Sequence, residues 1–371
     1  YEPNGGYGII RFPADRAILS YLGKWYMFGW AFGDLMKDRP TICLADDHEV
    51  FQGNLWGNGG KKVSQENWQK SMDATSGFVE PVEMVNVVIR TNTSHQPEAF
   101  NPTPIKQGME VYYTDIVYGR ISFALVTDRT FKSGPEEVVE ATKGMYWNGR
   151  KDMLYEDYPA SSEEKEKSLK LLGERQIEFL NHWMRDWEGA DMKVLLSQTI
   201  FANNVTHYGP KKVILRSDLD SGGWPKHGRD KAVNIMRKCF AFQICGDQHL
   251  PSFVQYGIED YKDANWAFCT PAIAVGYQRR FMPDTLGKPF SGRPAHNFSN
   301  TGLYTDGIGN KNFVYAVGNP DDITDHKNRY QKAQNCASGF GYVTFKQKER
   351  TITSNALRFL PKELDEKRRD N

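Results

Sequence analysis

The stretch ICLADDHEVFQGN at residues 42–54 begins with apolar residues and continues into a run of ionisable ones. Thr41–Leu44 has the apolar character of a buried strand, and Asp46–Glu49 follows it almost at once. In α/β proteins, ligands bind beyond the carboxyl ends of the strands. The stretch therefore predicts an α/β fold with a functional site at one edge of its sheet.

Three further apolar runs end in polar residues in the same way. They are Ile121–Val126, followed by Asp128 and Arg129; Met192–Leu196, followed by Ser197 and Gln198; and Phe240–Cys245, followed by Gly246, Asp247, Gln248 and His249. Apolar residues recur at helical spacing in Arg16–Lys37, Ser168–Glu188 and Arg229–Phe240. Strands that alternate with helices favour a layered α/β domain.

The sequence after Asp247 changes to short strands rich in glycine, proline and aromatic residues. We expect Gly339–Phe345 to pair with Thr351–Leu357 in a second sheet that also contains Val314–Val317. Residues 1–360 are interpreted as one domain and residues 361–371 as a charged tail. Two long insertions, at 53–80 and 132–162, have the composition of loops, and we expect the first to wall the site.

The composition excludes several classes of function. The 371 residues include 47 basic and 46 acidic side chains, so no overall charge favours nucleic acid or an anionic membrane. No run approaches the roughly 20 apolar residues of a transmembrane helix. The five cysteines are predicted to be buried free thiols. Neither a Gly-x-Ser-x-Gly elbow nor a phosphate-binding P-loop is present in the sequence.

Carboxylates and imidazoles at two strand ends are typical of a metal site. Asp47 and His48 follow one predicted strand, and Asp247 and His249 follow another. Two cations about 3.5–4 Å apart can clamp a phosphoryl group during in-line attack, and such sites take ligands from several strand ends. Other interpretations remain open, because Asp46 or Asp47 can also cap a helix and His249 can be an ordinary polar-core residue.

These residues resemble those of the alkaline phosphatase D (PhoD-like) family of metallophosphoesterases. The resemblance rests on Asp46–Val50 with Asn54, on Gly246–His249, and on Tyr1, which matches the tyrosine of the family's Gly-Asp-x-x-Tyr motif. It implies a four-layer α/β/β/α sandwich that hydrolyses phosphate mono- or diesters through a metal-activated water at a di- or multinuclear site. Export to the periplasm or the extracellular space is implied by the resemblance alone.

The resemblance also implies roles for individual residues. Tyr1 would ligate Fe³⁺, and Asp47, Asp247 and His249 would ligate iron and a second metal, which is calcium or another divalent ion. His48 would act in catalysis. Three sets of residues have weaker assignments: Asp46 and Asn54 as metal ligands or their neighbours, Arg129 as a phosphate contact or a structural ion pair with Asp128 or another carboxylate, and His207 and Asp220 as substrate contacts or ordinary loop residues.

The family's upstream cysteine or aspartate ligands have no counterpart in these 371 residues. One expectation is that a separate N-terminal fragment or subunit supplies them to a working phosphoesterase, and another is that the sequence is an N-terminally incomplete piece of such an enzyme. The alternative is a catalytically incomplete, metal-binding or structural subunit of an assembly that keeps the same scaffold.

Overall fold

A computed structural model describes residues 10–71, 75–137, 167–215, 218–273, 278–283, 292–323 and 325–358. Tyr1 and the tail at 361–371 lie outside these residues, as does most of the second insertion. The helices are α1 (Ala14–Met36), η1 (His48–Val50), α2 (Gln65–Ser71), α3 (Val82–Thr93), η2 (Lys106–Gly108), α4 (Asp128–Phe131), η3 (Pro135–Glu137), α6 (Gly173–Trp183), α7 (Lys226–Lys238) and α8 (Arg329–Asn335).

The described strands form three sheets. They are β1 (Thr114–Tyr118), β2 (Ile121–Leu125), β3 (Met192–Thr199), β4 (His207–Tyr208), β5 (Val213–Ile214), β6 (Phe242–Gly246), β7 (Ser252–Tyr256), β8 (Trp266–Cys269), β9 (Arg279–Arg280), β10 (Gly302–Thr305), β11 (Lys311–Val317), β12 (Gly339–Lys346) and β13 (Thr351–Arg358). The main sheet has the order β1-β2-β3-β6-β8-β7-β11-β10. Its centre, β2-β3-β6-β8, is parallel, and the strands on either side are antiparallel.

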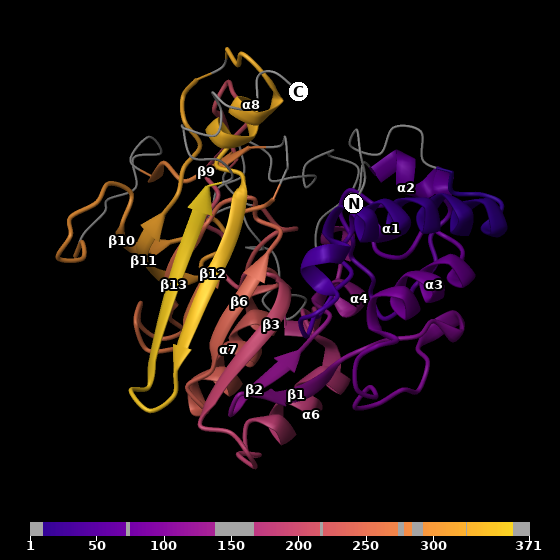
Figure 1. Ribbon diagram of the computed structural model, residues 1–371, viewed down its shortest axis with the longest axis horizontal. Helices are drawn as coiled ribbons and strands as arrows, with labels where there is room; N and C mark the ends of the chain where they lie inside the picture. The colour runs from indigo at the N-terminus through magenta and orange to yellow at the C-terminus, as the bar shows by residue number, and fades with distance from the viewer. Residues whose placement is uncertain are drawn as a thin grey trace.

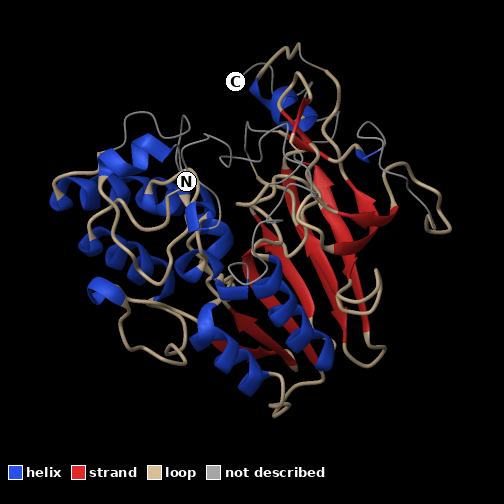
Figure 2. Cartoon of the chain, turned by 180° about the vertical axis from the view of Figure 1, so that it is seen from behind, coloured by secondary structure: helices blue, strands red, loops and turns tan. Residues whose placement is uncertain are grey.

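Helices and a hairpin cover opposite faces of the main sheet. The β12–β13 hairpin crosses one face in Figure 1, and α6 and α7 cover the other in Figure 2. Phe123 of β2 meets Phe345 of β12 edge to face, with 6.1 Å between the ring centroids. On the helical side, Trp183 of α6 donates a hydrogen bond from Nε1 to Oγ of Ser122 at 2.8 Å. The α/β class is confirmed, and the parallel centre of the sheet brings the carboxyl ends of β3 and β6 together.

A second hydrophobic core lies between α1, α3 and the segment around η1. It includes Tyr21, Phe51 and Val88, all buried. Tyr21 also joins α1 to α3, because its hydroxyl lies 2.6 Å from Oγ1 of Thr91. This core supports the chain that carries residues 45–51 toward the main sheet. Trp30 of α1 lies outside this core, because it is 83% exposed.

Most of the predicted elements are present, but two predictions are wrong. Thr41–Leu44 is not a strand, and two of its carbonyl groups contact side chains instead. The oxygen of Thr41 lies 2.9 Å from Nε2 of His95, and that of Cys43 accepts from Nε2 of Gln96 at 3.4 Å. The second error concerns Val314–Val317, which lies in the main sheet as part of β11 rather than in the second sheet.

The cysteines are free, as expected, although one is only half-buried. Cys239, Cys245, Cys269 and Cys336 are buried, whereas Cys43 is intermediate. Along the described parts of the chain, no helix combines the length and the apolar character that a membrane crossing requires.

Candidate functional site

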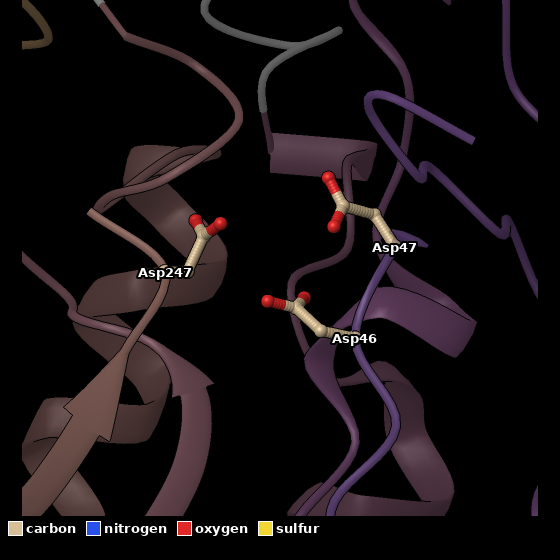
Figure 3. Close-up of side chains that lie close together, drawn as sticks. All are labelled: Asp46, Asp47 and Asp247. Carbon is tan, nitrogen blue, oxygen red and sulfur yellow. The ribbon is translucent and has the colours of Figure 1, made fainter. Parts of the chain in front are cut away.

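Three carboxylates from two distant parts of the chain converge beside the carboxyl end of β6. Asp46 and Asp47 come from the segment before η1, and Asp247 directly follows β6 (Figure 3). One oxygen of each lies within 4.8 Å of the others. Such a set of oxygens suits hard divalent cations. The structure therefore brings together three of the predicted metal ligands.

Asp47 has two roles in this arrangement. Its Oδ1 accepts a hydrogen bond from the backbone N–H of His48 at 2.7 Å, as the residue that caps η1. Its Oδ2 lies 3.8 Å from Nη2 of Arg129, on the side of the carboxylate cluster. The capping interpretation is thus confirmed for Asp47. The hydrogen bond to Oδ1 orients the carboxylate and leaves Oδ2 for contacts within the cluster.

The loop after β6 holds Asp247 in an uncommon backbone conformation. Asp247 and His249 have φ values of 61° and 52°, in the left-handed region that non-glycine residues seldom occupy. Two side-chain hydrogen bonds stabilise the loop: Arg279 donates from Nη1 to the carbonyl of Asp247 at 2.9 Å, and Gln248 donates to the carbonyl of Ala202 at 3.0 Å. Backbone strain of this kind is concentrated at functional sites.

Arg129 lies at the centre of the carboxylates and is almost completely buried, with 1% of its side chain exposed. Its Nε is 2.5 Å from Oδ1 of Asp46, its Nη1 is 2.5 Å from Oδ1 of Asp220, and its Nη2 is 2.9 Å from Oδ1 of Asp247. Nη2 is close to Asp247 but lacks hydrogen-bond geometry toward it. The ion pairs of Arg129 are therefore with carboxylates other than Asp128.

Asp128 instead fixes the helix that carries Arg129. Its Oδ2 accepts from the N–H and Oγ1 of Thr199, at 3.1 and 2.5 Å, which ties α4 to the end of β3. Gln198 extends this connection: its Oε1 accepts from the N–H of Asp128 at 3.1 Å, and its Nε2 donates to the carbonyl of Ala45 at 3.0 Å. Gln198 thus joins three segments of the site. Its position at a strand end predicts a polar residue near the site but not these two contacts.

Lys132 is a buried charge that sequence analysis missed. Its Nζ donates to the carbonyl of Asp220 at 2.5 Å and lies 5.1 Å from the ring centroid of Trp56. Burial lowers the pKa of Lys132, although the nearby carboxylates oppose this. No pattern around a single lysine at the start of a loop could have shown that it is buried beside Arg129.

The carboxylates differ in their tendency to ionise. Burial raises the pKa of Asp46 to about 7 against the charge of Arg129, although the 26% exposure of this side chain moderates the effect. Burial, followed by the charge of Asp46, raises the pKa of Asp47 well above its usual value. Burial raises the pKa of Asp220 to about 6. Asp247 is also penalised by burial, but Arg129 and other cations hold its pKa below the usual value.

The remaining predicted residues lie around this cluster or apart from it. Asn54 is buried, and its Nδ2 has no hydrogen-bond partner among the described residues. His249 lies close enough for its charge to lower the pKa of Asp247, and His48 acts likewise on Asp47. His207 lies in the small β5-β4-β9 sheet, with Nδ1 2.9 Å from Oγ1 of Thr206.

The first insertion packs against the backbone of α4. The N–H of Gly57 donates to the carbonyl of Arg129 at 2.8 Å, and a side chain at this position would meet the carbonyl of Thr130 at 2.5 Å. Glycine is required for this close approach. The expected wall is therefore formed, in part, against the helix that carries Arg129.

Comparison with known families gives one match that covers most of the chain. The PhoD-like phosphatase family matches residues 26–353, which include every residue of the carboxylate cluster. The chain belongs to the PhoD-like phosphatase family. No curated protein is significantly similar to it.

One solved structure related to this PhoD-like chain is described as "Structure of PhoD". It has 18% sequence identity and a TM-score of 0.40, and the alignment covers 62% of the present chain. The chain spans 40% of the length of that structure.

Proposed function

We propose that this PhoD-like phosphatase hydrolyses phosphate mono- or diesters at the cluster of Asp46, Asp47 and Asp247, with the help of bound metal. The observation that carries the proposal is the convergence of these carboxylates, together with a buried carboxylate oxygen that lacks a hydrogen-bond partner among the described residues. Oδ2 of Asp247 is buried and makes no hydrogen bond with any described residue. Because a buried carboxylate oxygen without a hydrogen bond is costly, a cation held by the three carboxylates would be a favourable partner for it.

The residues present fit a divalent cation. Asp46, Asp47 and Asp247 would hold it, through oxygen donors of the kind that Mg²⁺, Ca²⁺ and Mn²⁺ prefer. A bound cation of this type offsets charge on phosphate oxygens and lowers the pKa of a water that it holds. Tyr1, which the family resemblance assigns to iron, lies outside the described residues. The three carboxylates themselves offer oxygen donors that suit calcium or another divalent ion.

His48 is proposed as the residue that protonates the leaving group or stabilises the charge that develops on it. The first turn of η1, which Asp47 caps, fixes the backbone of His48 beside the cluster. A histidine is suited to this step because its pKa lies near neutrality. We expect His48→Ala to lower turnover on the order of 10²-fold or more while the bound metal per chain stays unchanged, as measured by elemental analysis of the assayed sample. Equal losses of metal and turnover would contradict this role.

Asp247→Asn tests the proposed metal site directly. The substitution keeps the shape of the side chain but removes its charge, so we expect it to abolish both Mn²⁺ binding, measured by electron paramagnetic resonance, and hydrolysis of p-nitrophenyl phosphate and bis(p-nitrophenyl) phosphate. Asp191→Asn is the matched control, because Asp191 pairs with Arg120 at the surface. Activity retained in Asp247→Asn would overturn the assignment, and the two substrates separate monoesterase from diesterase activity.

One observation favours the second candidate, a metal-binding or structural subunit without activity. Arg129 and Lys132 already offset part of the negative charge of the cluster, as they would in a structural core. In that case the wild-type protein would bind Mn²⁺ but hydrolyse neither substrate.

A further inference from the structure

Arg129 contacts one oxygen each of Asp46 and Asp247. It contacts Oδ1 of Asp46 and Oδ1 of Asp247, at 2.5 and 2.9 Å. Oδ2 of Asp247 is left without a hydrogen bond among the described residues. Arg129 therefore lies against one oxygen of Asp247, and the other oxygen of this carboxylate is available to a cation.

The planar guanidinium can do this for several carboxylates at once. Its three nitrogens reach four aspartates, since Nη2 lies near both Asp247 and Asp47, and one of the four, Asp220, lies outside the group of convergent oxygens. A lysine ammonium is a compact point charge that lacks this fixed fork. The geometry at Arg129 thus depends on the shape of the group as well as on its charge.

Asp220 and α4 in turn fix Arg129. The guanidinium is bound to Asp220 through Nη1, and Lys132 holds the carbonyl of the same aspartate. Gly222, in the same loop, has no room for a side chain, because a Cβ there would meet the carbonyl of Ala202 at 2.3 Å. With Asp128 tied to Thr199 on the other side, Arg129 lies between two fixed supports.

We propose that Arg129 is a positioning residue that holds Asp46 and Asp247 in the arrangement that binds a divalent cation, and that Asp220 acts on the cation only through Arg129. This inference rests on the metal site of the proposed function. It assigns to Arg129 a role other than contact with substrate, in agreement with its burial. Partners that orient metal-binding carboxylates commonly change metal affinity by about 10–100-fold when they are removed.

The test is Mn²⁺ binding to Arg129→Lys, measured by electron paramagnetic resonance as free ion against total ion. The substitution keeps the charge and loses the fork, so we expect the dissociation constant to rise by at least about 10-fold. Arg237→Lys is the matched control, since Arg237 contacts Glu259 and Asp263 on the exposed side of α7. Its affinity for Mn²⁺ should equal that of the wild type.

Asp220→Asn alone provides a second measurement that remains valid if Arg129→Lys folds poorly, and an unchanged affinity for Mn²⁺ in this variant would overturn the inference. Alone, it should also weaken Mn²⁺ binding, because it releases Nη1 of Arg129. In the Arg129→Lys background the same substitution should have little further effect. If Asp220→Asn weakens binding equally in both backgrounds, Asp220 acts through its charge alone, and the inference is overturned.

The outcomes for this inference and for the proposed function differ. A wild-type protein that binds no Mn²⁺ would contradict the metal site itself. A wild-type protein that binds Mn²⁺ with the same affinity as Arg129→Lys would leave the metal site in place and overturn only the positioning role.

Discussion

Arg129 and Arg237 each meet more than one carboxylate, but their surroundings are opposite. Arg129 is 1% exposed, and its partners Asp220 and Asp247 are 2% and 6% exposed. Arg237 is 29% exposed, and its partner Glu259 is 67% exposed. The distances are similar, at 2.5–2.9 Å around Arg129 and 2.7 Å between Arg237 and Glu259. Burial, rather than distance, distinguishes the two networks.

The difference follows from the cost of removing charges from water. Around Arg237, solvent screens the charges and can replace a lost partner, so the pair contributes little to stability. Around Arg129, each carboxylate has lost most of its hydration and depends on the guanidinium. A buried network of this kind is weak evidence for stability as a whole, but breaking it leaves uncompensated charge. The same dependence makes the network suitable for positioning metal ligands.

The largest expected effect separates the two arginines by stability. Arg129→Met should lower the free energy of unfolding by about 3–5 kcal/mol, because it leaves buried carboxylates without a partner. Arg237→Met should lower it by less than about 1 kcal/mol. Denaturant unfolding of both variants in the presence of a chelator measures this difference. Similar losses in the two variants would show that burial does not distinguish the networks.

Much of the fold could be predicted from the sequence, but the site could be predicted only in part. Apolar runs showed β2, β3 and β6, because buried parallel strands have a continuous hydrophobic sequence. The polar residues after them correctly pointed to one edge of the sheet. The run at Thr41–Leu44 looked the same, yet it forms no strand. Periodicity does not show whether a segment has a neighbouring strand with which to pair.

The central position of Arg129 was beyond the reach of sequence analysis for a different reason. Its partners lie 83, 91 and 118 residues away along the chain, and nothing local specifies which carboxylates meet. Asp128, its neighbour in sequence, was a candidate for an ion pair, but the carboxylate of Asp128 accepts hydrogen bonds from Thr199 instead. Lys132 was missed for the same reason, since its burial depends on Trp56 and Asp220, which come from other segments.

A smaller effect is the pH dependence of stability, which has opposite signs for a buried and a surface carboxylate. Burial raises the pKa of Asp220 from 3.8 to about 6, whereas a hydrogen bond from Arg120 lowers the pKa of the surface residue Asp191. A raised carboxyl pKa means that the folded state binds more protons than the unfolded state. The contribution of Asp220 to stability is therefore greatest below about pH 4 and decreases as the pH rises to about 6. The contribution of Asp191 is present above pH 4 and is lost at lower pH.

Asp220→Asn should remove the first of these dependences. In the presence of a chelator, the free energy of unfolding of the wild type should decrease between pH 4 and pH 6 relative to that of the variant, by up to about 1.4 kcal/mol per pH unit. Asp191→Asn should leave this slope unchanged above about pH 5, because Asp191 is then ionised in both states. Asp46 and Asp47 also have raised pKa values, so only the difference between the two proteins reports on Asp220. If the slope in Asp220→Asn equals that of the wild type, Asp220 is already ionised through its pairing with Arg129. The carboxylate would then be fully available to hold the guanidinium even at pH 4, so Mn²⁺ affinity at that pH would not be limited by this pair.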